Sequence, residues 1–133
     1  MKKCSFILCA ILLLFVGNIC TWANPSSSEE SVSVESEDLM ITLSNIYHST
    51  GHVDAVATVT NENEGYPSGN YTYEWSVTPG GTGTTCYVSP DTGQRVNVGG
   101  NSSNPNSSRV EIKCIVYQNG SVYDILYNYL YFY

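Results

Sequence analysis

The sequence predicts an all-β domain of about seven antiparallel strands, and three observations lead to this class. After residue 38, apolar residues recur at every second position, which is the period of a strand with one buried face. Clusters of Gly, Pro, Asn, Asp and Ser separate these segments at regular spacing, as turns between strands do. No part of the chain after residue 23 sustains the 3.6-residue apolar period of an amphipathic helix. We therefore expect a β-sandwich.

Residues 1–23 have the composition of a secretory signal peptide. Lys2 and Lys3 form a basic start, and a largely apolar run from 6 to 16 follows. That run is too short to span a bilayer comfortably. We therefore expect a secreted protein, located outside the cell, in the periplasm or at the cell surface, with no membrane span once the signal is removed.

Two ways of processing this signal compete. The small residues Thr21 and Ala23 favour cleavage of the signal between Ala23 and Asn24. Cys20 offers the alternative of a lipid anchor, but Gly17 and Ile19 occupy positions where such signals prefer an aliphatic and a small residue. Cleavage after Ala23 is the favoured interpretation.

Residues 24–38, NPSSSEESVSVESED, are rich in Ser and Glu and almost devoid of apolar residues. This is the composition of a solvated linker, which we expect to space the domain from a surface or a neighbouring domain. A docking tail for a basic partner is the alternative. The folded domain is expected to occupy residues 39–133.

The charge balance after signal removal is strongly acidic. All twelve acidic residues remain, against only Arg95, Arg109 and Lys113, for a formal charge of about −9. Such a field repels phosphate backbones. Nucleic acid is therefore not an expected partner.

The first three expected strands each present one apolar face. The third, YTYEWSV, is the clearest, because Tyr, Tyr, Trp and Val alternate with Thr, Glu and Ser before a turn at residues 78–81. The inward residues of the three strands are Leu39, Ile41 and Leu43; Val53, Ala55, Ala57 and Val59; and Tyr71, Tyr73, Trp75 and Val77.

Four further strands are expected. Residues 84–88 and 95–98 form two short ones, separated by the turn sequence SPDTGQ. A polar loop, 101–108, precedes a sixth strand, and an Asn-Gly hairpin at 119–120 leads into the last one. The sixth strand faces inward with Val110, Ile112, Cys114 and Val116 and outward with Arg109, Glu111 and Lys113.

Cysteine usage predicts one disulfide. Signal removal discards three of the five cysteines and leaves Cys86 and Cys114 in an oxidising compartment. A crosslink over this loop length constrains the unfolded chain by about 3–4 kcal/mol. The alternative, a redox or metal-binding thiol pair, lacks a CxxC spacing and a nearby histidine.

The segment YEWSVTPG at residues 73–80, two short strands, the strand VEIKC at 110–114 and an Asn-Gly hairpin follow one another. Together they resemble the PKD-like and immunoglobulin-like domains of bacterial secreted and surface proteins. The resemblance implies an immunoglobulin-like (PKD-like) antiparallel sandwich with Trp75 in its core, and a role in adhesion, spacing or ligand display. One departure is that both Cys86 and Cys114 follow Trp75, whereas immunoglobulin domains place the Trp between their two cysteines.

Two segments are weak candidates for metal binding. Asn61, Glu62, Asn63 and Glu64 alternate oxygen ligands before a glycine, but no bidentate acid follows at the distance that a calcium loop requires. His48, His52 and Asp54 would converge only on a helix, and the residues between them indicate a turn. We favour an acidic turn and solvated loop histidines, and expect no metal and no cofactor.

No convergent catalytic group is apparent, so the protein is not expected to be an enzyme. The triplet Asp91-Thr92-Gly93 occurs in aspartic proteases, but here it follows Ser89-Pro90 and is better explained as a turn. No GxSxG motif and no Cys-His pair is present.

The chain ends on YDILYNYLYFY, in which nearly every residue is apolar or aromatic. Either Leu126, Leu130 and Phe132 face the core and tyrosines cover the outside, or the reverse. If tyrosines are exposed, they suit contact with a protein or glycan at a cell surface. The candidate binding surface is Tyr123, Tyr127, Tyr129, Tyr131 and Tyr133.

The predicted function is therefore a secreted or cell-surface binding and adhesion module. The alternative is a structural surface spacer, or a subunit that associates with itself through its tyrosine-rich last strand, since an aromatic edge strand invites pairing with another chain.

Overall fold

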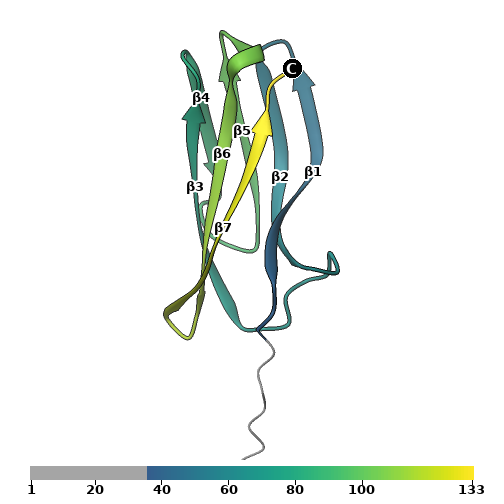
Figure 1. Ribbon diagram of the computed structural model, residues 1–133, viewed down its shortest axis with the longest axis vertical. Coiled ribbons are helices and arrows are strands. Elements are labelled where there is room, and N and C mark those ends of the chain that lie inside the picture. Colours follow the sequence, from purple (N-terminus) through teal and green to yellow (C-terminus); the bar gives the residue numbers. More distant parts are fainter. Residues whose placement is uncertain (1–35) are drawn as a thin grey trace, which may run out of the picture. The chain divides into compact units, whose positions relative to one another are not determined.

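Seven strands and one short 3-10 helix make up the part of the chain that the computed structural model describes, residues 36–133 (Figure 1). The signal peptide, its cleavage site and residues 24–35 of the linker lie outside the described residues. No helix among residues 36–133 has the length and apolar character needed to cross a membrane. The elements are β1 (Leu39–Ser49), β2 (His52–Asn61), β3 (Tyr71–Gly80), β4 (Thr84–Ser89), β5 (Arg95–Ser102), η1 (Pro105–Ser107), β6 (Arg109–Gln118) and β7 (Ser121–Tyr131).

The strands form two antiparallel sheets. One sheet has the order β1-β2-β5-β4 and the other β3-β6-β7. Apolar side chains from both sheets pack into one buried cluster between them. The predicted all-β class, with seven antiparallel strands, is confirmed and agrees with a β-sandwich.

The core consists of the alternating positions that the sequence indicated. In β2 and β6 every second side chain is buried almost completely, and each buried valine or isoleucine contributes about 1.5–3 kcal/mol through its removal from water. These two strands lie in different sheets, so their buried faces meet across the interior. The buried residues are Val53, Ala55, Ala57 and Val59 in β2, and Val110, Ile112, Cys114 and Val116 in β6.

Trp75 lies in the core, as predicted, with only 3% of its surface exposed. Its indole Nε1 donates a hydrogen bond to the carbonyl oxygen of Gly93 at 2.7 Å, and its backbone N–H donates to that of Asp91 at 2.8 Å. The Asp-Thr-Gly triplet therefore belongs to a turn whose carbonyls hold the tryptophan.

Strand β5 is longer than predicted. It continues through Gly99 and Gly100 to Ser102, where a polar loop was expected. A Cβ at Gly99 would lie 2.6 Å from the carbonyl oxygen of Val53, so the neighbouring strand occupies the space of the missing side chain. The two glycines thus mark close packing between strands.

The predicted disulfide is absent, because Cys86 and Cys114 are both free thiols. Cys114 lies in the middle of β6 and pairs with Trp75, whereas Cys86 lies on β4, an edge strand of the other sheet. A disulfide needs a Cα separation of about 4.4–6.8 Å, so cysteines on two facing sheets can be joined only where the strands that carry them approach each other closely. Burial raises the pKa of Cys114 to about 12 and also raises the pKa of Cys86.

The edge strands β1 and β7 lie side by side and close one side of the sandwich (Figure 1). The side-chain amide of Asn128 donates a hydrogen bond to the carbonyl oxygen of Ile41 at 2.7 Å. At the end of both strands the rings of His48 and Tyr133 meet edge to face, with centroids 4.8 Å apart. The edge of β7 is thus partly covered by its own chain.

Glu37, placed in the linker by sequence, contacts the folded domain. Its carboxylate accepts hydrogen bonds from the backbone N–H of Ser68 at 3.1 Å and from the side chain of Asn61 at 3.3 Å. Partial burial acts to raise the pKa of Glu37, but hydrogen bonds from Ser68, Asn61 and the Gly69 backbone outweigh it, so that the pKa is lowered. The compact unit accordingly spans Glu37–Tyr133.

Candidate functional site

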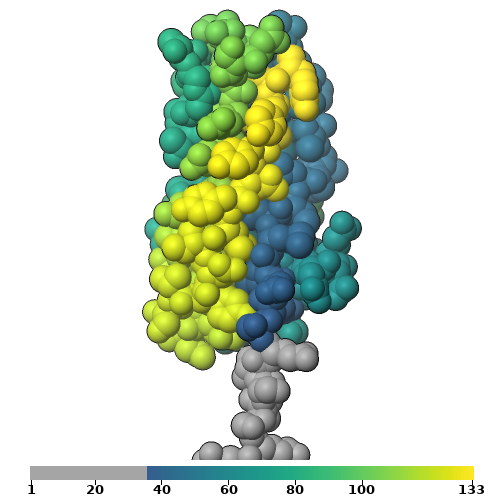
Figure 2. All heavy atoms as spheres, in the orientation of Figure 1, coloured from purple at the N-terminus to yellow at the C-terminus, as the bar shows by residue number. Residues whose placement is uncertain are grey.

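The outer face of the β3-β6-β7 sheet carries the exposed tyrosines of the last strand. Leu126, Leu130 and Phe132 of this segment are buried, so the alternate residues point to solvent. Figure 2 shows residues of β7 as a continuous yellow band across the surface. Tyr127, Tyr129 and Tyr131 are 53%, 39% and 50% exposed.

The strand register places a charged row of β6 beside these rings. Tyr127 pairs with Lys113, Tyr129 with Glu111 and Tyr131 with Arg109. We call these six residues the tyrosine face. It contains two of the three basic residues in the described part of the chain, so this face is locally less acidic than the domain as a whole.

Tyr123 does not belong to this face, although the sequence suggested it. The β6-β7 register shifts between Val116 and Tyr117, and Tyr123 is left without a partner in the ladder, as in a β-bulge. Its ring packs against Tyr71 with centroids 5.0 Å apart, and its hydroxyl donates to the carbonyl oxygen of Glu37 at 3.0 Å. Tyr123 therefore has a structural role, because its ring and its hydroxyl both contact the rest of the domain.

Arg109 is held on the tyrosine face by an aromatic ring. Its guanidinium carbon lies 5.2 Å from the centroid of the Tyr129 ring, and the Tyr129 and Tyr131 rings are 6.4 Å apart. A cation over a ring at an exposed site contributes about 0.5–1 kcal/mol. Within residues 36–133 the guanidinium of Arg109 has no carboxylate within ion-pair distance, so its charge is available to a ligand.

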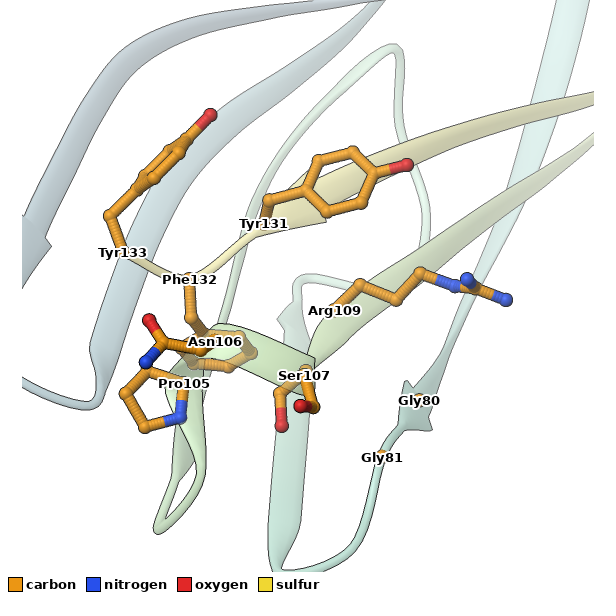
Figure 3. Close-up of a pocket in the computed structure, with 10 residues that line it drawn as sticks. Gly80, Gly81, Pro105, Asn106, Ser107, Arg109, Tyr131, Phe132 and Tyr133 are labelled. Carbon is orange, nitrogen blue, oxygen red and sulfur yellow. The ribbon is translucent and has the colours of Figure 1, made fainter.

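A cavity of about 530 Å³ adjoins the tyrosine face at one end of the sandwich (Figure 3). The end of β3, the 3-10 helix η1, the start of β6 and the C-terminal segment surround it. Its volume lies within the range of about 300–1,000 Å³ that is usual for small-ligand pockets. The lining residues are Gly80, Gly81, Pro105, Asn106, Ser107, Ser108, Arg109, Tyr131, Phe132 and Tyr133.

Ser108, which lines this end pocket, belongs to a network of hydroxyl groups. Ser108 Oγ donates to the carbonyl oxygen of Asn104 at 2.7 Å and accepts from Thr84 Oγ1 at 2.9 Å. Ser102 Oγ lies 2.7 Å from Ser108 Oγ. Because these groups satisfy one another, the position of Ser108 at the pocket is fixed by the fold.

The weak calcium candidate forms a turn. The side-chain oxygen of Asn61 accepts hydrogen bonds from the backbone N–H groups of Asn63 and Gly65, at 3.1 and 2.9 Å. Glu62 and Glu64 lie exposed in the same turn. Among the described residues, no three His, Cys, Asp or Glu side chains are placed to hold a metal ion.

The two histidines point to different places. His52 Nε2 lies 2.8 Å from Asp54 Oδ2, and His52 Nδ1 lies 2.9 Å from Asn101 Oδ1, whereas His48 contacts Tyr133. These hydrogen bonds, first to Asn101 and then to Asp54, raise the pKa of His52. The structure thus does not bring His48, His52 and Asp54 together.

Comparisons of this chain with protein-family models, with curated proteins and with solved structures found no match.

Proposed function

We propose that this chain is a secreted or cell-surface binding module with an immunoglobulin-like fold and no enzymatic activity, which recognises a protein or glycan partner through its tyrosine face. The strand orders support the fold assignment. Constant-type immunoglobulin domains place their first, second, fifth and fourth strands in one sheet and their third, sixth and seventh in the other. The same two orders occur in this chain.

The observation that carries the proposal is the exposure of three tyrosines on one face of a sheet whose opposite face packs into the core. Tyrosine offers a large contact area and a hydroxyl group while losing little conformational entropy on binding. Within residues 36–133, the hydroxyls of Tyr127, Tyr129 and Tyr131 make no hydrogen bond to the protein. Both the rings and the hydroxyls are therefore available to a partner.

Self-association through the last strand is the second candidate, because β7 is an edge strand of its sheet. The hydrogen bond from Asn128 to β1 weighs against strand addition at this edge, since an incoming strand would have to displace β1. Contact between two tyrosine faces would require no such displacement.

The test is a triple substitution, Tyr127→Ser, Tyr129→Ser and Tyr131→Ser, in the chain that begins at Asn24. The control replaces Tyr47 and Tyr66, which are exposed elsewhere on the domain, with Ser. Binding is measured with cell-surface proteins and with a glycan array, and self-association by analytical ultracentrifugation. The triple variant should lose its partner while remaining folded, because three exposed rings that contribute about 0.2–1 kcal/mol each cost about 0.6–3 kcal/mol in total.

Two outcomes would overturn the proposal. One is equal partner binding by the triple variant and the wild-type chain. The other is a collapse of the melting temperature, which would mean that the rings belong to the fold. Deleting residues 123–133 is not a usable test, because the segment contributes Leu126, Leu130 and Phe132 to the core.

A further inference from the structure

The end pocket and the tyrosine face share two residues, Arg109 and Tyr131. In Figure 3 these two side chains extend alongside each other in the same direction, while Tyr133 points to the other side of the pocket. A ligand that lies along the tyrosine face can therefore place one of its units in the pocket. The surface is continuous and does not form two separate sites.

The position of Arg109 at this shared rim is set by packing. A Cβ at Gly80 would lie 2.9 Å from Arg109 Cγ, so the aliphatic part of the arginine lies directly over the glycine. The guanidinium is placed over the Tyr129 ring and has no acidic partner among the described residues. A guanidinium held in this way presents two parallel N–H groups, which match the two oxygens of a carboxylate.

The pocket also offers neutral polar groups. The side chains of Asn106 and Ser107 line it and make no hydrogen bond to other residues in the described part of the chain. Tyr131 and Tyr133 line the same pocket. Aromatic rings beside amide and hydroxyl groups suit a ligand with apolar C–H surfaces and several hydroxyls, which is the chemistry of a sugar ring.

The surrounding charge limits how acidic that ligand can be. Arg109 is the only residue with a charged side chain that lines the pocket, Glu111 follows it on the same face of β6, and acidic residues outnumber basic ones in the chain by twelve to five. A densely charged polyanion would be repelled. A single carboxylate next to neutral hydroxyls fits one guanidinium.

We propose that the end pocket binds a sugar unit that carries a carboxylate, as part of an acidic glycan recognised by the tyrosine face. The carboxylate pairs with the guanidinium of Arg109, and the ring hydroxyls bond to Asn106 and Ser107. This proposal rests on the binding function above and names the class of its ligand.

The experiment is an NMR titration of the ¹⁵N-labelled chain from Asn24 with four probes. Sialyllactose and trigalacturonate provide carboxylated sugars from two sources, lactose is the neutral sugar, and tetraglutamate is an acidic peptide without sugar. The two acidic sugars, or one of them, should shift the amide signals of Gly81, Ser107 and Arg109 in a saturable way. Lactose should bind at least tenfold more weakly, and tetraglutamate should not saturate.

Matched variants assign the effect to the proposed contact. Arg109→Gln should reduce the affinity for the acidic sugar to that for lactose. Arg109→Lys should lose most of the affinity, because a point charge cannot form the paired hydrogen bonds. Gly80→Ala, which displaces the arginine without removing it, should weaken binding several-fold. Arg95→Gln, an exposed arginine in the other sheet, should change nothing. Urea unfolding of each variant checks that it is folded.

Three results would overturn the pocket proposal: equal binding of lactose and the acidic sugars, equal binding of tetraglutamate, or no shift of these amides with any saccharide. The failure of the binding function is a separate outcome. If no saccharide binds but the triple tyrosine variant still loses its partner, the pocket proposal is wrong and the tyrosine face remains a binding surface. If the triple variant keeps its partner, the function itself is wrong.

Discussion

Replacing neighbouring residues of β7 one at a time measures directly which face of this strand is buried. Leu130→Ala removes a side chain that is 3% exposed, and Tyr127→Ser removes a ring that is 53% exposed. A buried leucine truncated to alanine costs about 2–5 kcal/mol, because the lost burial adds to the cavity left behind. An exposed aromatic residue in a sheet contributes about 0.2–1 kcal/mol through its cross-strand neighbours. The two variants should therefore differ by about 1–5 kcal/mol.

The assay is urea unfolding of both variants and of the wild-type chain, followed by tryptophan fluorescence. Trp75 is buried and is the only tryptophan among the described residues, so its emission reports the opening of the core. The urea concentration at the unfolding midpoint should fall far more for Leu130→Ala than for Tyr127→Ser. The dependence of the unfolding free energy on urea concentration should stay the same in both variants. In a domain of this size, each kcal/mol corresponds to a shift of about 4–8 °C in the melting temperature.

The reasoning would be refuted by equal losses in the two variants, or by a larger loss in Tyr127→Ser. Either result would mean that the tyrosine rings are buried, and no binding surface would remain on the β3-β6-β7 sheet. A change in slope would instead point to an altered unfolded state.

Three further predictions concern titratable groups. The raised pKa of His52 means that its contribution to stability is present at pH values below about 6.5 and is lost as the pH rises through the folded pKa. In urea unfolding, His52→Gln should therefore be less stable than the wild-type chain at about pH 5.5 and equally stable at about pH 8.5. The lowered pKa of Glu37 has the opposite effect: Glu37→Gln should destabilise the domain at neutral pH, and the difference should vanish as the pH falls below the folded pKa; a constant difference would contradict the assignment. Cys114, with a pKa raised to about 12, should resist alkylation by iodoacetamide in the folded domain, and both cysteines should react after unfolding without a reductant; recovery of no free thiol would show that Cys86 and Cys114 form a disulfide.

The sequence predicted the strands whose two faces differ in polarity. In β6, Arg109, Glu111 and Lys113 alternate with aliphatic residues, so only one face can be buried. In β7 both faces are apolar or aromatic, and period 2 alone did not decide between them. Packing against β1 and the opposite sheet decides it, and these contacts join residues far apart in the sequence, such as Asn128 and Ile41, which are 87 positions apart.

The rest of the site depends on features that have no local signature. The bulge at Tyr123 is one residue in a strand whose two faces are both largely apolar or aromatic, and it moves that tyrosine to the core side. The end pocket joins three separate segments, around Gly80, Pro105 and Tyr131. The disulfide was predicted from the number of cysteines and from the expected oxidising compartment. A disulfide also requires the two cysteines to lie close together in the fold, and composition does not determine that.

The start of the domain at Glu37 and the end pocket lie at opposite ends of the strands. The chain enters at Glu37, and β1 runs from that end to the other, where β7 also finishes beside the end pocket (Figure 1). Strand β1 has 11 residues and spans about 35 Å. If the chain is tethered through residues before Glu37, a pull between the tether and a ligand in the pocket acts along the strands. The ladder hydrogen bonds between β1 and β2 then bear the load together in shear, which resists force far better than peeling them apart one by one.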